Sequence, residues 1–257
     1  MRLAPDTPKT VVISGVGSER GIGRAIAQRM AEEGWAVAGG DLDGAAAELL
    51  ATQLTDQYGI PAYGAALDVT DPDSIARLQQ AVLDAGLPPV GAVMPVAGVA
   101  APESILEVSL SLWERVFAVN STGTYLLVQP FLPGMIEAGW GRIVTMSSVS
   151  AQQGGGVFSK TAYSAAKAAI LGYTRSVARE LAPHGITANS VSPGAVDTDI
   201  RAGSTDDAKE AALSASVPLG RQASVADIAA LFAFLASEHA GYITGATVNI
   251  NGGGYIA

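Results

Sequence analysis

The chain has 257 residues, 49% of them hydrophobic, and a formal net charge of −9. This length and composition are typical of one globular domain with a substantial core. The negative charge disfavours binding to the phosphates of nucleic acids and to anionic membrane surfaces. We therefore expect a small-molecule ligand and neither a nucleic-acid nor a membrane partner.

The residue types present limit the chemistry available. The chain has no cysteine, which excludes disulfides, thiolate metal sites and a cysteine nucleophile. Its only histidines are His184 and His239, so we expect no metal site and no Ser-His-Asp triad. The first ten residues lack the pattern of a signal peptide, and no apolar run reaches membrane-spanning length. We expect a cytoplasmic protein.

A strand, a glycine-rich loop and a helix follow one another near the start of the chain. Residues 10–14 (TVVIS) form a β-branched run typical of a buried parallel strand, and residues 24–33 have a helical pattern. Between them lies GVGSERGIG, residues 15–23. In this order the loop amides and the helix N-terminus can surround a diphosphate. The sequence therefore predicts a dinucleotide site.

The next predicted strand ends at Asp41, eighteen residues after Gly23. A carboxylate there accepts hydrogen bonds from ribose hydroxyls and repels a 2′-phosphate, which favours NAD over NADP. Arg20, in the glycine loop, argues the other way because it could bind that phosphate. A cap of the following helix is the structural alternative for Asp41. We give Asp41 more weight and expect NAD.

Strands and helices alternate along the rest of the chain. Asp71 is expected to cap a helix with Pro72 in its first turn, Ser111 with Glu114 to form a capping box, and Ser224 to cap a late apolar helix. A polar stretch at residues 195–222 predicts a substrate lid, with a short helix at 206–216. The further strands are predicted at residues 62–67, 90–94, 142–146, 186–192 and 246–250. This alternation predicts a Rossmann-type, doubly wound parallel sheet of about seven strands in a single α/β domain, residues 1–257.

Tyr163 and Lys167 are four residues apart in an alanine-rich helical pattern. Side chains at this spacing are neighbours on one helix face. A nearby ammonium favours the phenolate, so the pair predicts a tyrosine with a pKa below its usual value of about 10 and able to exchange protons near neutral pH. The alternative is an ordinary pair on an amphipathic helix.

Over essentially its full length the chain resembles the short-chain dehydrogenase/reductase family. The resemblance rests on the glycine loop, the YxxxK pair and the Pro193-Gly194 segment, in the right order. It implies a catalytic tetrad of Asn120, Ser148, Tyr163 and Lys167. It also implies that the cofactor is bound by Tyr163 and Lys167 together with Gly15, Gly17, Gly21, Ile22, Gly23, Asp41, Asp68, Val69, Ala97, Gly98, Pro193, Gly194, Val196 and Thr198.

The same resemblance implies a role for each member of the tetrad. Tyr163 would act as general acid/base, and Lys167 would lower its pKa and hold the nicotinamide ribose. Ser148 would orient the substrate oxygen. Asn120 would hold a water that relays protons to Lys167, or would have a purely structural role.

The chain departs from the family pattern at three places. Five residues separate Gly15 from Gly21 where the family has three. Pro95-Val96 replaces two asparagines, so we expect the strand to end at residue 94. Ser150 has the commoner spacing to Tyr163, but we choose Ser148 because it lies at the strand end. The loop that follows makes Ser150, Gln152 and Gln153 candidate substrate contacts, or a plain surface turn.

These observations predict an NAD-dependent oxidoreductase that interconverts a secondary alcohol and a ketone, with a polyol, sugar or other hydroxylated substrate. The alternative is an NADPH-dependent reductase of 3-oxoacyl thioesters. A cofactor-binding redox sensor without turnover is the third possibility. The resemblance also implies a homotetramer or homodimer. Trp113, Phe117, Phe232 and Phe234 are candidate interface residues, with a place in the core as the alternative for each.

Overall fold

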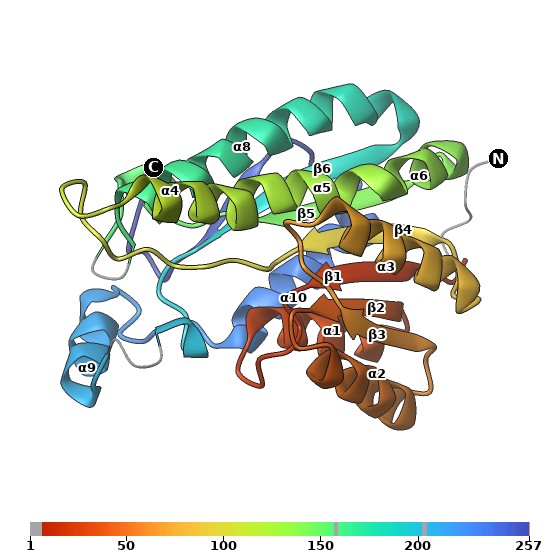
Figure 1. The fold of residues 1–257 in the computed structure, drawn as a ribbon, viewed down its shortest axis with the longest axis horizontal. Helices are drawn as coiled ribbons and strands as arrows, with labels where there is room; N and C mark the ends of the chain where they lie inside the picture. Colours follow the sequence, from red (N-terminus) through yellow and green to blue (C-terminus); the bar gives the residue numbers. More distant parts are fainter. Residues whose placement is uncertain (1–6, 157–158, 202–204, 257) are drawn as a thin grey trace.

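The computed structural model describes residues 7–156, 159–201 and 205–256. Its centre is a seven-stranded parallel sheet of order β3-β2-β1-β4-β5-β6-β7 (Figure 1). The order reverses between β1 and β4, the crevice where sheets of this type bind ligands. The strands are β1 (Thr10–Ser14), β2 (Ala36–Asp41), β3 (Ala62–Ala66), β4 (Val90–Pro95), β5 (Gly141–Met146), β6 (Ile186–Pro193) and β7 (Thr247–Ile250). The predicted fold class is confirmed.

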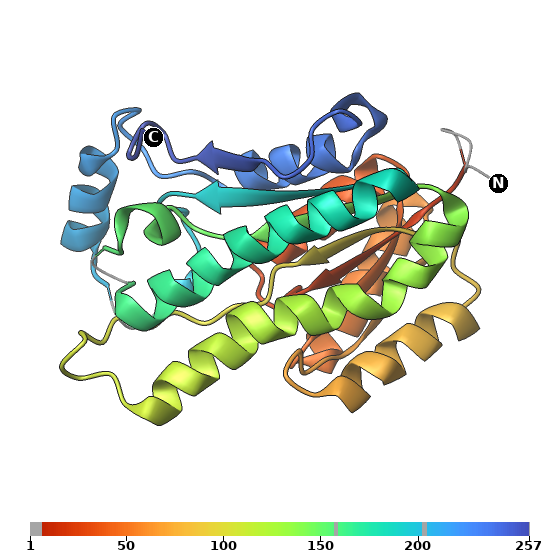
Figure 2. The same ribbon diagram turned by 90° about the horizontal axis from the view of Figure 1, so that it is seen from above.

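Helices cover both faces of the sheet (Figure 2). On one face α1 (Ile22–Glu32), α2 (Gly44–Tyr58) and α10 (Val225–Ala236) bury apolar side chains in one core cluster. The other face carries α3, α5, α6 and α8 over a second cluster. The remaining helical segments are α3 (Pro72–Asp84), α4 (Leu110–Phe117), α5 (Gly123–Val128), α6 (Leu132–Ala138), α7 (Ser150–Gln153), α8 (Thr161–Leu181) and α9 (Asp207–Ser216), with a π-helical turn at Ala118–Thr122 and 3-10 turns at Gln129–Phe131, Ala182–His184, Asp199–Arg201 and Glu238–Ala240.

Two expectations about element ends are wrong. β4 continues to Pro95, which pairs with Ser14 of β1. The proline is the last residue of the strand, so its missing N–H interrupts no later bond, and the Ser14 hydroxyl accepts the next two N–H groups, of Val96 and Ala97, both at 3.1 Å. The cap of α4 is Ser109, not Ser111, because the Ser109 hydroxyl accepts the Leu112 N–H at 3.2 Å.

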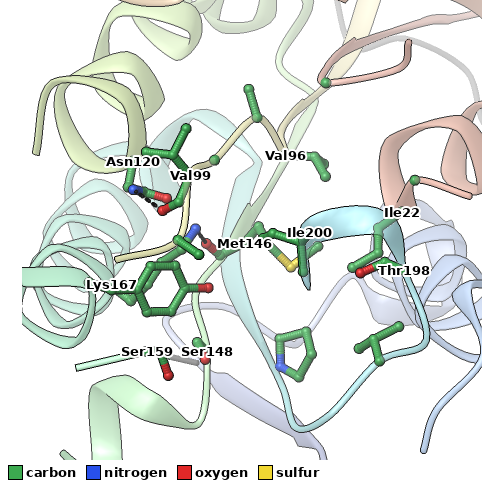
Figure 3. A pocket seen from close by; sticks show the side chains of 18 of the residues that line it. Ile22, Val96, Val99, Asn120, Met146, Ser148, Ser159, Lys167, Thr198 and Ile200 are labelled. Atoms are coloured by element: carbon green, nitrogen blue, oxygen red, sulfur yellow. Dashed lines mark hydrogen bonds between the residues drawn. The ribbon is translucent and has the colours of Figure 1, made fainter. Parts of the chain in front are cut away.

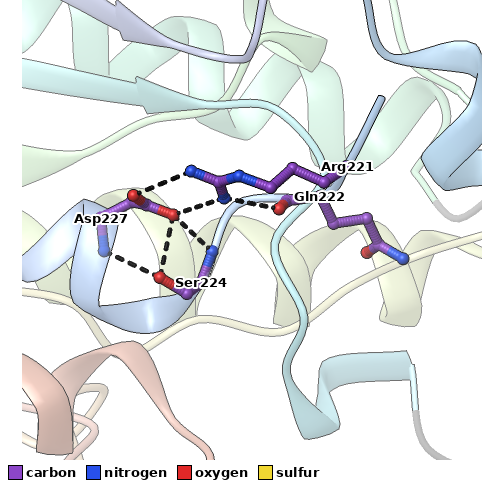
Figure 4. A network of polar contacts seen from close by, with 4 residues as sticks. All are labelled: Arg221, Gln222, Ser224 and Asp227. Atoms are coloured by element: carbon purple, nitrogen blue, oxygen red, sulfur yellow. Dashed lines mark hydrogen bonds and ion pairs between the residues drawn. The ribbon is translucent and has the colours of Figure 1, made fainter. Parts of the chain in front are cut away.

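The caps predicted at Asp71 and Ser224 are confirmed. Ser224 and Asp227 form a reciprocal capping box at the start of α10, and Arg221 donates to Asp227 at 2.8 Å and 3.2 Å (Figure 4). This network fixes the point where the segment after β6 returns to the sheet. That segment contains the predicted short helix, α9, capped by Asp206.

Candidate active site

A cavity of about 580 Å³ opens at the carboxyl ends of the strands (Figure 3). Its wall combines the glycine loop, the ends of β2 to β6, the π-helical turn, α8 and the segment after β6. Of the residues predicted to bind cofactor or to act in catalysis, all except Gly17 line it. Ser150 and Gln153 also line it, whereas Gln152 does not.

The glycine loop is tightly packed against its neighbours. Gly15 has φ +79°, and a β-carbon there would lie 3.0 Å from the Ala97 backbone. A β-carbon at Gly23 would lie 2.2 Å from the carbonyl oxygen of Gly15. Larger residues would therefore push α1 away from β1 and close the crevice between them.

Asp41 connects the end of β2 to this loop. Its carboxylate accepts the Gly17 N–H at 2.8 Å and the Asp43 N–H at 3.1 Å. The cap of α2 is Asp43, whose side chain accepts the Ala46 N–H, so the cap alternative for Asp41 is wrong. Gly17 does not line the cavity, but its N–H holds the Asp41 carboxylate in place. Asp41 itself still faces the cavity.

Arg20, the other charged group in the cofactor argument, pairs with Asp197 and lies 3.6 Å from Asp199. The neighbouring Ser18 hydroxyl donates to Asp199 at 3.0 Å. These partners lie on the segment after β6. Ser18 and Arg20, in the longer part of the glycine loop, therefore contact the far side of the crevice and not β2.

Tyr163 and Lys167 lie on one face of α8, with the Lys167 nitrogen 5.6 Å from the tyrosine ring centre. Burial raises the pKa of Tyr163 to about 12, against a smaller lowering by a hydrogen bond with Ser148. The ring keeps some exposure to solvent, which tempers this shift. Burial also lowers the pKa of Lys167 to about 7. The expected tyrosine pKa below 10 is wrong here, because burial favours the neutral phenol more than the Ser148 hydroxyl favours the phenolate.

The two candidate serines are in different environments. Ser148 follows β5, and its hydroxyl lies near enough to the Tyr163 phenol to lower the pKa of that phenol. The Ser150 hydroxyl lies 2.7 Å from that of Ser159 instead. Position at the strand end, rather than spacing along the chain, therefore brings Ser148 to the tyrosine.

Asn120 lies in the π-helical turn at Ala118–Thr122 and is fully buried. Its side-chain amide donates to the carbonyls of Val99 and Val116 at 3.0 Å and 2.9 Å. Its Oδ1 accepts no hydrogen bond among the described residues. A β-carbon at Gly98 would lie 2.7 Å from this oxygen and 3.5 Å from the Lys167 nitrogen. Glycine at position 98 therefore leaves space between the two polar groups.

Several residues that line the cavity were missed by the sequence analysis. They are mostly apolar or small, and no chemical motif marks them. Ile200 and Leu213 lie within the predicted lid. Their hydrophobic side chains in an otherwise polar stretch were the signal that could have identified them. The others include Leu42, Val99, Ala100, Arg115 and Val119.

The described residues contain no group of three or more His, Asp and Glu side chains placed to hold a metal ion. Within the described part of the chain, no helix is both long and apolar enough to cross a bilayer.

Comparisons with known proteins agree with this architecture. Residues 15–254 match the family model described as Enoyl-(Acyl carrier protein) reductase. An uncharacterised short-chain type dehydrogenase/reductase of Sinorhizobium fredii is 40% identical, with 95% of this chain and 96% of the relative aligned. A 3-oxoacyl-[acyl-carrier-protein] reductase of Aquifex aeolicus is 37% identical (92% and 94%), and a (3R)-3-hydroxyacyl-CoA dehydrogenase of Rattus norvegicus is 39% identical (94% of each).

A solved structure extends the likeness to three dimensions. The crystal structure of a short-chain type dehydrogenase/reductase from Mycobacterium marinum superposes with a TM-score of 0.88 at 30% identity, covering 98% of this chain and 97% of that one. The family match, these relatives and the sheet topology are consistent with one another. The chain belongs to the short-chain dehydrogenase/reductase family of oxidoreductases.

Proposed function

We propose that the protein is an NAD-dependent enzyme that interconverts a secondary alcohol and a ketone. The observation that carries this proposal is the grouping of Ser148, Tyr163 and Lys167 in one cavity with the glycine loop and Asp41. A proton-transferring group and a dinucleotide-binding crevice in the same space are what such a reaction requires.

The cavity fits a nicotinamide dinucleotide. The close packing at Gly15 and Gly23 brings the start of α1 onto the cavity wall, and a helix N-terminus there suits a diphosphate. Asp41 suits the ribose hydroxyls, and Lys167 suits the ribose beside the nicotinamide. When bound, the nicotinamide supplies the hydride donor or acceptor.

Residues of the chain itself would donate and relay the proton that accompanies hydride transfer. With a raised pKa, the Tyr163 phenol stays protonated at neutral pH and can donate to a carbonyl oxygen in reduction. Ser148 orients that oxygen. Lys167 titrates near neutral pH and is therefore suited to pass the proton on. The free Oδ1 of Asn120, next to the space at Gly98, suits a water in this relay.

Two charged groups support NAD over NADP. Asp41 lies at the end of β2 and would repel a 2′-phosphate. The charge of Arg20, the nearby base that could attract it, is already balanced by Asp197 and Asp199.

The substrate expected from the sequence is a polyol, sugar or other hydroxylated small molecule. The relatives named above favour a second candidate, a 3-hydroxyacyl or 3-oxoacyl thioester. The apolar side chains of Ile200 and Leu213 suit an acyl chain, and the exposed guanidinium of Arg115 on the same wall suits an anionic carrier group. The net charge of −9 makes a small carrier such as a coenzyme a better fit than an acidic protein.

A homotetramer or homodimer in the cytoplasm completes the proposal. Phe232 is fully buried in the core of the chain, so it is not an interface residue. Phe234 is 44% exposed, and Trp113 and Phe117 stack at 4.8 Å on α4. Gel filtration with light scattering tests this assembly, and a monomer would contradict it.

The activity is tested with purified protein, NAD or NADP, and a panel of polyols, secondary alcohols and 3-hydroxyacyl thioesters, with 3-oxoacyl thioesters for the reverse direction. We expect a change in nicotinamide absorbance with NAD. Turnover of a polyol would support the first substrate class, and turnover of a thioester the second. Activity with NADP(H) alone would contradict the cofactor assignment.

A further inference from the structure

The glycine loop and the segment after β6 are joined by side chains far apart in sequence. Arg20 pairs with Asp197 and lies 3.6 Å from Asp199, and the Ser18 hydroxyl donates to Asp199 at 3.0 Å. Ser18 and Asp199 both line the cavity. The contacts therefore bridge its mouth, from the start of α1 to the strand-β6 side.

These side-chain contacts follow directly after a short stretch of backbone pairing with Ala223. The N–H of Asp197 donates to the Ala223 carbonyl at 3.0 Å, and that of Ala223 donates to the Ala195 carbonyl at 2.9 Å. Val196 forms an isolated parallel bridge with Ala223. Just beyond this backbone pairing, the Asp197 and Asp199 carboxylates contact the glycine loop through Arg20 and Ser18.

Thr198 lies between the two aspartates and faces the cavity with Ile200 (Figure 3). Asp197 and Asp199, the two neighbours of Thr198, are both in contact with the glycine loop. The contacts with Arg20 and Ser18 therefore restrain the orientation of Thr198 toward the cavity. The same two residues come from the stretch between Gly15 and Gly21, where the loop is longer than its family pattern. A shorter loop would have less chain with which to reach the segment.

We propose that Arg20 and Ser18 are positioning residues, which hold Asp197 and Asp199 against the glycine loop, fix Thr198 on the cavity wall and slow the release of a bound dinucleotide. This inference rests on the proposed function for the presence of the dinucleotide. It assigns to Arg20 a role in cofactor retention rather than in recognition of a 2′-phosphate.

The ion pairs of Arg20 with Asp197 and Asp199 are weak enough to break when the cofactor leaves. The side chains of Arg20, Asp197 and Asp199 are 58%, 65% and 43% exposed. Ion pairs this exposed contribute little individually and are screened by salt. They can therefore bias the segment toward the closed position without trapping the cofactor.

The test measures release of NADH by stopped-flow fluorescence from the full-length protein at low and high salt. The variants are Arg20→Ala, Asp197→Asn with Asp199→Asn, and the triple combination. Arg29→Ala is the matched control, because Arg29 lies on α1 and pairs with Glu33 away from the cavity.

We expect Arg20→Ala and the double Asp variant each to release NADH about three- to ten-fold faster, and the triple variant no faster than these. Wild-type release should speed up with salt, and release from Arg20→Ala should not. The sign for the double variant is decisive. If the aspartates acted only as negative charges near an anionic cofactor, their removal would slow release, and that result would overturn the proposal.

Hydrogen exchange on the ligand-free protein separates the two proposals. Amides of residues 197–201 should exchange faster in Arg20→Ala than in wild type or Arg29→Ala. Unchanged exchange would overturn the positioning role even where NADH binds. If wild type binds no dinucleotide while the exchange difference is present, the proposed function and the retention role fail, and only the structural bridge remains.

Discussion

The amine of Lys167 donates a hydrogen bond to the Met146 carbonyl at 2.9 Å while lying 5.6 Å from the centre of the Tyr163 ring. The lysine is therefore held by the end of β5 and lies over the tyrosine ring. Burial brings the pKa of Lys167 to about 7 and that of Tyr163 to about 12. At neutral pH the phenol is therefore protonated, while the amine is close to its midpoint.

Replacing Tyr163 by Phe should lower kcat by about 10²–10⁴-fold, because the phenol is the proposed proton donor. Binding of NADH, followed by fluorescence titration, should change little. Tyr173→Phe is the control, since Tyr173 lies farther along α8 and does not line the cavity. A Tyr163→Phe enzyme with wild-type kcat would refute the proposed chemistry.

The two candidate serines can be separated by paired alanine variants. Ser148→Ala removes the hydroxyl that contacts the Tyr163 phenol and should lower kcat by about 10²-fold. Ser150→Ala removes only the contact with Ser159 and should reduce kcat less than about ten-fold. Steady-state kinetics of both variants on one substrate provide the comparison. The reverse order would assign the substrate contact to Ser150.

Asp41→Asn should shift cofactor preference toward NADP by roughly 10–100-fold in the ratio of dissociation constants. Asparagine keeps an acceptor for the Gly17 N–H, so the effect reports on charge rather than on loop order. Titrations with both reduced cofactors measure the ratio. Asp43→Asn, a change of the neighbouring helix cap, is the charge-matched control. An unchanged ratio in Asp41→Asn would place the specificity elsewhere.

The sequence predicted the sheet and the order of its elements, because these follow from local patterns along the chain. The family resemblance supplied most of the site residues, and nearly all of these line the cavity. The sequence could not predict that Asp197 and Asp199 lie against Arg20, since that contact depends on how a long segment folds back. The tyrosine pKa was also mispredicted. Spacing on a helix places Lys167 beside Tyr163, but only the packed structure shows how strongly both are desolvated.

The cap of α4 and the end of β4 illustrate a second limit. Ser111 with Glu114 predicted one start for α4, whereas the helix starts two residues earlier, where the Ser109 hydroxyl accepts the Leu112 N–H. Pro95 breaks the rule for central strands, but its place at the strand end makes the missing donor harmless. The end of β4 is thus set by its pairing with β1, a neighbour that is distant in sequence.

Asp227→Asn should destabilise the protein by about 1 kcal/mol, which lowers Tm by about 2–4 °C. The hydrogen bonds from Arg221, and then those from Ser224, hold the pKa of Asp227 well below its usual range. A depressed carboxyl pKa contributes stability above the unfolded value of about 3.9 and loses it as pH falls below that value. Thermal melts at pH 7 and pH 3.5 should therefore differ less in the variant. Asp56→Asn, at an exposed site on α2, is the control. Equal pH dependence in wild type and Asp227→Asn would contradict the assignment.

Lys167→Met should change how stability depends on pH. Lysine titrates at about 10.4 in an unfolded chain, and burial lowers the folded pKa of Lys167 to about 7. Between these values the unfolded state binds more protons, so the free energy of unfolding of wild type rises with pH. Methionine keeps the apolar stem and carries no charge, so the variant should lose most of this rise. Lys209→Met, at an exposed site paired with Asp206, should keep it. Chemical denaturation from pH 7 to pH 9.5 provides the slopes, and equal slopes in wild type and Lys167→Met would show that the amine stays protonated in the folded protein.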